Sequence, residues 1–71
     1  MLTLRLLYTK SNQEFQTWIY ELSGPHFSSA LFNVSEEDCR ELRSGSEDVA
    51  YRLAIDLLKE LNLNHLTIEV Q

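Results

Sequence analysis

The chain has 71 residues, of which 11 are acidic and 6 are basic, so its net charge at pH 7 is −5. This length predicts one small domain over residues 1–71, with a limited core and a thin margin of stability. The negative charge argues against a surface that binds nucleic-acid phosphates, because such a surface needs clustered Lys and Arg side chains.

The first half of the chain has the alternation of β-strands. Apolar and polar residues alternate over residues 2–8, and aromatic and β-branched side chains are frequent in residues 15–22. A polar, turn-rich segment separates these two strands. Gly24 and Pro25 predict a turn before a third strand over residues 27–34. Three consecutive strands with short connections predict an antiparallel meander.

The second half of the chain predicts two helices and a final strand. Ser35, with Asp38 three residues later, has the spacing of a capping box. The strongest helical period covers residues 47–62, with Ser46 as the expected N-cap. Alternation over residues 65–71 then predicts a fourth strand. The main apolar stripe of the long helix comprises Ala50, Leu53, Ala54, Leu57 and Leu61.

The predicted class is therefore α+β, in the order β-β-β-α-α-β, with a three-stranded antiparallel meander and a C-terminal strand. We expect the helix over residues 47–62 to cover one face of the sheet. Asn62 or Asn64 should end this helix, because Asn tolerates left-handed backbone angles. No run of about 18 apolar residues occurs, so no membrane-spanning helix is expected. A lone cysteine, Cys39, and the lack of an export signal predict a cytoplasmic location.

The chain has more apolar surface than one long helix can cover. In the second strand, large apolar side chains alternate onto both faces, and the sequence leaves open which face the helix covers. On the long helix, a second apolar strip flanks the main one, and it either widens the core or contacts another chain. We predict a partner interface that comprises Trp18 and Tyr20 from the strand and Tyr51, Ile55 and Leu58 from the helix.

Acidic residues gather where the two predicted helices begin. The positive end of a helix dipole favours carboxylates, so one interpretation is a solvated pair of helix starts. The other interpretation is an acidic surface that steers a basic partner protein toward the interface. The residues of this cluster are Glu36, Glu37, Asp38, Glu41, Glu47 and Asp48.

No constellation in the sequence predicts catalysis or metal binding. Cys39 is flanked by carboxylates, which raise the pKa of a thiol and disfavour its reactive form. His26 borders a turn and His65 begins a strand, so no pattern brings the two imidazoles together. The spacings of zinc sites, phosphate-binding loops and nucleophile elbows do not occur. We therefore predict no enzyme activity, no cofactor, and no catalytic or metal-binding residue.

These features predict a small, acidic, non-enzymatic module for protein–protein interaction or regulation, which either forms a homodimer or binds a larger protein. The alternative is a role related to nucleic acids. In one form the acidic surface mimics a nucleic acid and inhibits a protein that binds one. In the other form Trp18 and Tyr20 stack on bases, as on a sheet-based RNA-binding surface.

Overall fold

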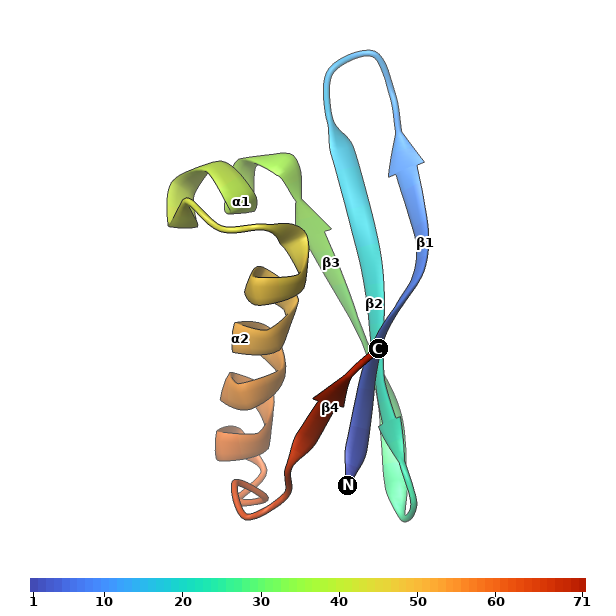
Figure 1. Cartoon of the computed structure of the whole chain (residues 1–71), viewed down its shortest axis with the longest axis vertical. Helices are drawn as coiled ribbons and strands as arrows, with labels where there is room; N and C mark the ends of the chain where they lie inside the picture. The colour runs from blue at the N-terminus through green and yellow to red at the C-terminus, as the bar shows by residue number, and fades with distance from the viewer.

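The computed structural model describes all 71 residues and shows one four-stranded sheet with two helices beside it (Figure 1). The order of its elements confirms the predicted α+β class and the predicted succession of strands and helices. The elements are β1 (Leu2–Ser11), β2 (Gln16–Gly24), β3 (Phe27–Ser35), α1 (Glu36–Leu42), α2 (Ser46–Glu60) and β4 (Ile68–Val70).

The strands lie side by side in the order β3-β2-β1-β4. β1, β2 and β3 form the predicted antiparallel meander, whereas β4 pairs parallel to β1 from Leu2 to Leu4. The chain therefore leaves the sheet at β3, passes through both helices and returns at the opposite edge. Asn62 follows α2 with a φ of 57°, as predicted. Because residues 64–66 then turn the chain, β4 is shorter than the strand expected over residues 65–71.

Local hydrogen bonds fix the start of α1 but not that of α2. The Ser35 hydroxyl accepts from the Asp38 N–H, and the Asp38 carboxylate accepts from the Ser35 N–H, both at 3.1 Å, so the capping box is confirmed. The predicted N-cap of α2 is wrong, because Gly45 occupies that position without a side-chain cap. The Ser46 hydroxyl instead lies 2.8 Å from the Tyr20 hydroxyl and ties the start of α2 to the sheet.

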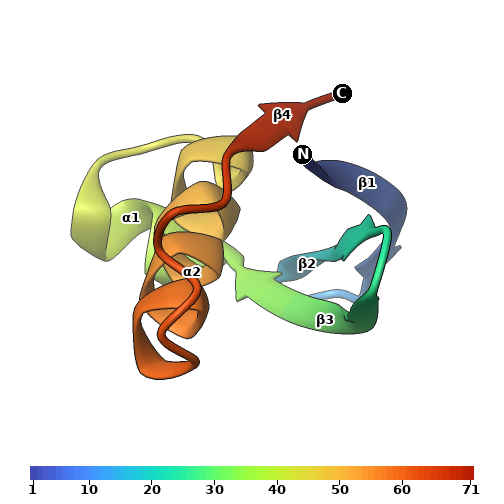
Figure 2. The same cartoon turned by 90° about the horizontal axis from the view of Figure 1, so that it is seen from below.

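The core lies between α2 and one face of the sheet. The strands curve around one side of this helix, and β3 is the strand nearest to it (Figure 2). Ala50 and Ala54 are fully buried, and such small side chains let a helix approach a sheet closely. Nine buried residues form the core cluster: Leu2, Leu4, Tyr20, Leu22, Val34, Val49, Ala50, Ala54 and Leu58.

The helix α2 is rotated about its axis relative to the predicted orientation. Leu53 and Leu61, which belong to the predicted apolar stripe, are 37% and 50% exposed, whereas Val49 and Leu58 are buried. Two apolar strips lie next to each other on this helix, and together they are wider than the surface that the sheet covers. Packing against the curved sheet therefore selects the strip on which the small residues lie.

Two residues at the turn between β2 and β3, Gly24 and His26, have different structural roles. His26, not Gly24, takes the left-handed conformation in this turn, with a φ of 58°. Gly24 is needed for another reason: a Cβ at this position would lie 2.5 Å from the Cδ2 atom of Leu2 in β1. Carbon atoms that are not bonded stay much farther apart. The missing side chain thus lets the end of β2 lie close against the start of β1.

Candidate functional site

The predicted interface residues do not form one exposed surface. Tyr20 and Leu58 are 5% and 1% exposed and belong to the core cluster, so their expected place at an open surface is wrong. Trp18 packs against that cluster and Ile55 is half-buried, while Tyr51 is 39% exposed. The reason is that α2 covers the sheet face from which Trp18 and Tyr20 project, and its rotation turns Leu58 inward. The helix α2 therefore also covers the sheet face on which Trp18 and Tyr20 were predicted to stack on nucleic-acid bases.

Two residues of the acidic cluster, Asp38 and Glu36, form hydrogen bonds or ion pairs within the chain. The Ser35 N–H and then its hydroxyl hold the pKa of the Asp38 carboxyl below its usual value, since both hydrogen bonds favour the ionised form. The Glu36 carboxylate lies 3.8 Å from the Arg40 guanidinium, one helical turn away. The remaining four side chains are exposed and form no ion pair: Glu37, Glu41, Glu47 and Asp48. The net negative charge of α1 therefore lies directly after the end of β3.

The lone cysteine does not form a reactive centre. Cys39 is half-buried and packs against the core cluster. Burial, and then the negative charges of Asp38 and Glu36, raise the pKa of its thiol. A thiol with a raised pKa is largely protonated at neutral pH and is a weak nucleophile. No three His, Cys, Asp or Glu side chains lie together in a group that could hold a metal ion.

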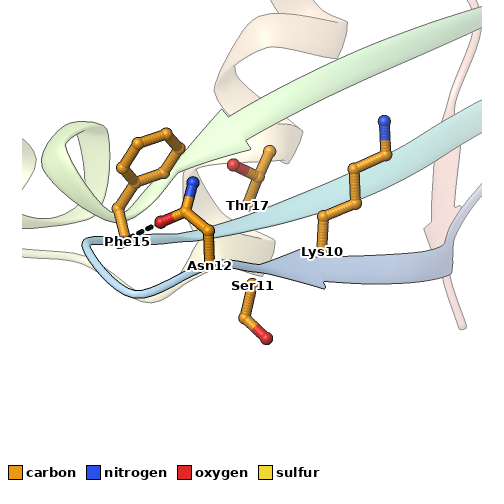
Figure 3. Close-up of a pocket in the computed structure, with 5 residues that line it drawn as sticks. All are labelled: Lys10, Ser11, Asn12, Phe15 and Thr17. Atoms are coloured by element: carbon orange, nitrogen blue, oxygen red, sulfur yellow. Dashed lines mark hydrogen bonds between the residues drawn. The ribbon is translucent and has the colours of Figure 1, made fainter.

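The largest hollow on the surface, about 440 Å³, lies at the tip of the β1–β2 hairpin (Figure 3). The Asn12 Oδ1 atom accepts hydrogen bonds from the N–H groups of Glu14 and Phe15 at 2.8 and 2.9 Å, so this amide holds the loop in shape. Figure 3 shows Ser11 on the other side of the hairpin from Lys10. These polar groups do not converge on a common point, and the hollow is a feature of the loop.

The backbone of β3 offers a more specific feature. β3 pairs with β2 on one side only, and no hydrogen bond from a turn, loop or cap reaches the backbone of residues 27–34. We call the outward-facing backbone of these residues the β3 edge. Half of the N–H and C=O groups of an edge strand point away from the sheet, so this edge is a template for another strand.

The β3 edge also carries no charge. All 11 acidic and all 6 basic residues of the chain lie outside residues 22–35, where His26 in the turn is the only ionisable side chain. At the midpoint of β3, Leu31 is 60% exposed, and no other large apolar side chain within a strand or helix is as exposed. Strand alternation places Leu31 on the face away from α2, since its neighbours Ala30 and Phe32 face the helix side with Leu22 and Tyr20.

One end of the β3 edge borders a second hollow. Asn33 of β3 lines a space of about 250 Å³ together with Leu42 of α1 and Leu53 of α2. Leu42 and Leu53 are both exposed by more than a third of their surface. Beside the C-terminal half of the β3 edge there is thus unfilled space that is lined by apolar side chains and by Asp38 and Glu41, whereas Ser28 and Ser29 in the N-terminal half are small and exposed.

The sequence analysis did not identify the β3 edge. The sequence contains the signal that could have found it, which is the uncharged segment over residues 22–35 in a chain whose other parts are rich in charge. A charge-free strand in the centre of a sheet gives the same signal, however. Only the strand order shows that β3 lies at the edge of the sheet.

Comparison with protein-family models, with curated proteins and with solved structures finds no match to this chain. None of its helices combines the length and the apolar character that a membrane crossing requires. Function therefore has to be inferred from the surface features described above.

Proposed function

We propose that this protein is a non-enzymatic protein-interaction module, and that a strand of a partner protein extends its sheet at the β3 edge. The observation that carries this proposal is the uncharged, unpaired backbone of residues 27–34. An added strand satisfies the outward N–H and C=O groups, and alternate side chains of the edge give the contact its specificity.

The side chains next to this edge suit such a contact. Leu31 is exposed on the face away from α2, where an added strand brings an apolar neighbour beside it. Glu37 and Glu41 of α1 lie beyond the end of β3 and form no ion pair, so they favour an approaching partner that is positive or neutral at this end. The interaction thus combines backbone pairing with apolar contact and electrostatic orientation.

The experiment incubates three immobilised baits with extracts of the source cells and compares the proteins that they retain. The baits are the natural chain, Leu31→Lys and Leu61→Lys. Leu31→Lys puts a charge on the edge, and the new ammonium lies opposite Glu21 of the same sheet, so the fold should tolerate it. Leu61 is also exposed and lies just beyond α2, so Leu61→Lys makes the same chemical change away from the edge.

We expect the natural chain and the Leu61→Lys bait to retain the same protein, and the Leu31→Lys bait to lose it. Circular dichroism on each bait establishes that all three are folded. Equal retention by all three baits would show that the retained protein does not bind at the β3 edge, and no specific retention by any of them would contradict a partner other than a second copy of this chain.

A further inference from the structure

One candidate for the strand that pairs with the β3 edge has a known sequence, namely β3 of a second copy of this protein. We infer that two copies pair antiparallel through β3, about a two-fold axis at Leu31, and form a continuous eight-stranded sheet from their two four-stranded sheets. This inference rests on the proposed function, because it names the partner at the same edge.

The distribution of charge favours self-pairing at this edge over any other. Each copy carries a net charge of −5, so two copies repel one another over most of their surfaces. Residues 22–35 form the one long segment without Asp, Glu, Lys or Arg. Contact through this segment brings together backbone dipoles and neutral side chains, and it leaves every charged residue of both copies outside the paired strands. The other unpaired strand backbones carry a charged side chain, Lys10 on β1 and Glu69 on β4, and such charges disfavour pairing between two copies there.

The position of α1 selects the antiparallel direction. The acidic residues Glu36, Glu37 and Asp38 follow β3 immediately, so parallel pairing would place the acidic α1 helices of both copies next to each other. Antiparallel pairing centred on Leu31 puts the two Ser35 residues eight residue steps apart, which is about 26 Å. This separation exceeds the Debye length of about 8 Å at physiological salt, so the repulsion between the two helices is largely screened.

The shape of the edge selects the register. With the axis at Leu31, all nine residues of β3 are paired, and Ser29 of each copy lies opposite Asn33 of the other. The small residues Ser28 and Ser29 of one copy then run past the end of the edge where Leu42 and Leu53 of the other copy line the 250 Å³ hollow. The half of each strand that has small side chains thus lies beside the unfilled space of its copy, and the two Leu31 side chains meet on the face away from α2.

A small chain also has a physical reason to associate. Only 10 of the 71 residues are buried, so the isolated protomer has little apolar burial to offset the entropy of folding. Pairing through β3 links the folded state to association, which stabilises folded chains by mass action.

The first test is sedimentation equilibrium of the full chain at several concentrations, together with Leu31→Lys and Leu61→Lys. We expect twice the protomer mass for the natural chain and for Leu61→Lys, and half that value for Leu31→Lys, in which two ammonium groups would face each other across the axis. A natural chain that keeps the protomer mass at every concentration overturns the inference, and so does a Leu31→Lys variant that keeps the doubled mass.

The second test reads the register and does not depend on the Lys variant. In a Cys39→Ser background, a cysteine replaces either Leu31 or Ser29, and mild oxidation follows. Residue 31 faces its own copy within the Cα separation that a disulfide allows, whereas the two residues at position 29 are about 13 Å apart. We expect a covalent dimer from Leu31→Cys and none from Ser29→Cys. The reverse pattern, or equal cross-linking of both, contradicts an axis at Leu31.

These results separate the inference from the function on which it rests. If the natural chain is a monomer, but its capture of another protein is lost in Leu31→Lys, the self-pairing is refuted and the interaction module stands. If the chain is a monomer and no capture depends on Leu31, both are refuted.

Discussion

The sheet has two long stretches of unpaired backbone, and they differ in how they are protected. One is the β3 edge. The other, which we call the β1 edge, is the outer side of residues 6–11, since β4 pairs only with residues 2–4 of β1. The β1 edge contains Lys10, follows Arg5 and has an irregular register between Leu6 and Tyr8. The β3 edge has no charged residue, and it too has a register irregularity, between Phe27 and Ala30, followed by a continuous register from residue 30 to residue 35.

This difference shows which edge is open to a partner. A lysine on an edge strand is one of the devices that keep natural edge strands from pairing with other chains, whereas a register irregularity occurs along both edges and does not distinguish them. The Lys10 ammonium also lies 5.8 Å from the centroid of the Tyr8 ring, so its charge stays over the exposed aromatic side chain of this edge. Length alone does not separate the two edges, because both leave several residues unpaired. The distribution of charge does separate them.

The largest expected effect on stability comes from truncating the buried side chain of β2 that packs between β1 and β3. Leu22 of β2 is fully buried and lies between Leu4 of β1 and Ala30 of β3. Leu22→Ala leaves a cavity beneath the centre of the sheet, and we expect it to lower the free energy of unfolding by about 2–5 kcal/mol. Urea denaturation measures this loss, with the exposed Leu61→Ala as the control. A loss as small as that of the control would mean that this contact does not hold the edges together.

The second prediction removes the protection of the β1 edge. Arg5→Thr combined with Lys10→Thr deletes both basic groups of β1, and we expect species larger than a dimer, because the chain then has two open edges instead of one. Sedimentation velocity measures their size. Arg52→Thr with Lys59→Thr on α2 gives the same net charge and serves as the control. If both double variants behave alike, net charge rather than edge protection limits association.

A third, smaller effect concerns the place where the β3 edge ends. Ser35→Ala removes the side-chain half of the capping box, and we expect it to cost about 1 kcal/mol of stability, the usual loss for a helix N-cap. Because the strand itself stays intact, the mass in solution should not change. Thermal unfolding and sedimentation equilibrium measure the two quantities. A change in mass at unchanged stability would assign α1, not β3, to the contact.

The smallest effect is expected from the ion pair on β1. The Arg5 Nε atom lies 3.4 Å from Glu21 Oε1, but the Arg5 side chain is 53% exposed, so solvent screens the attraction. We expect Arg5→Ala to lower the free energy of unfolding by no more than about 1 kcal/mol. Urea denaturation at low and at high salt measures it. A loss of several kcal/mol would show that Arg5 supports the fold itself rather than protecting the β1 edge.

Much of the fold could be predicted because the signals are local. The order of strands and helices follows from hydrophobic periods, and the capping box at Ser35 and the helix end at Asn62 depend on residues a few positions apart. The N-cap of α2 was predicted wrongly for a reason that is not local. The Ser46 hydroxyl has a second partner, the Tyr20 hydroxyl, which is 26 positions away in the chain.

The candidate site could not be predicted in the same way. Trp18 and Tyr20 alternate with Ile19, and either set could have faced α2. The structure buries Ile19 as well, at 2% exposure, on the face away from the core, between Tyr8 and Asn33 of the neighbouring strands. The large apolar side chains on both faces of β2 at residues 18–20 are therefore at least half-buried within one protomer, and the most exposed apolar side chain of the sheet is Leu31 instead.

The amino-acid sequence by itself determined the types and the order of the elements and some of their ends, such as the start of α1, since backbone propensity and capping act over a few residues. It also determined that residues 22–35 carry no charge. The tertiary structure alone decided which strip of α2 is buried, which face of β2 meets the helix and which strand lies at the edge. These choices depend on contacts between residues far apart in the chain, and several of them satisfy the same local pattern equally well.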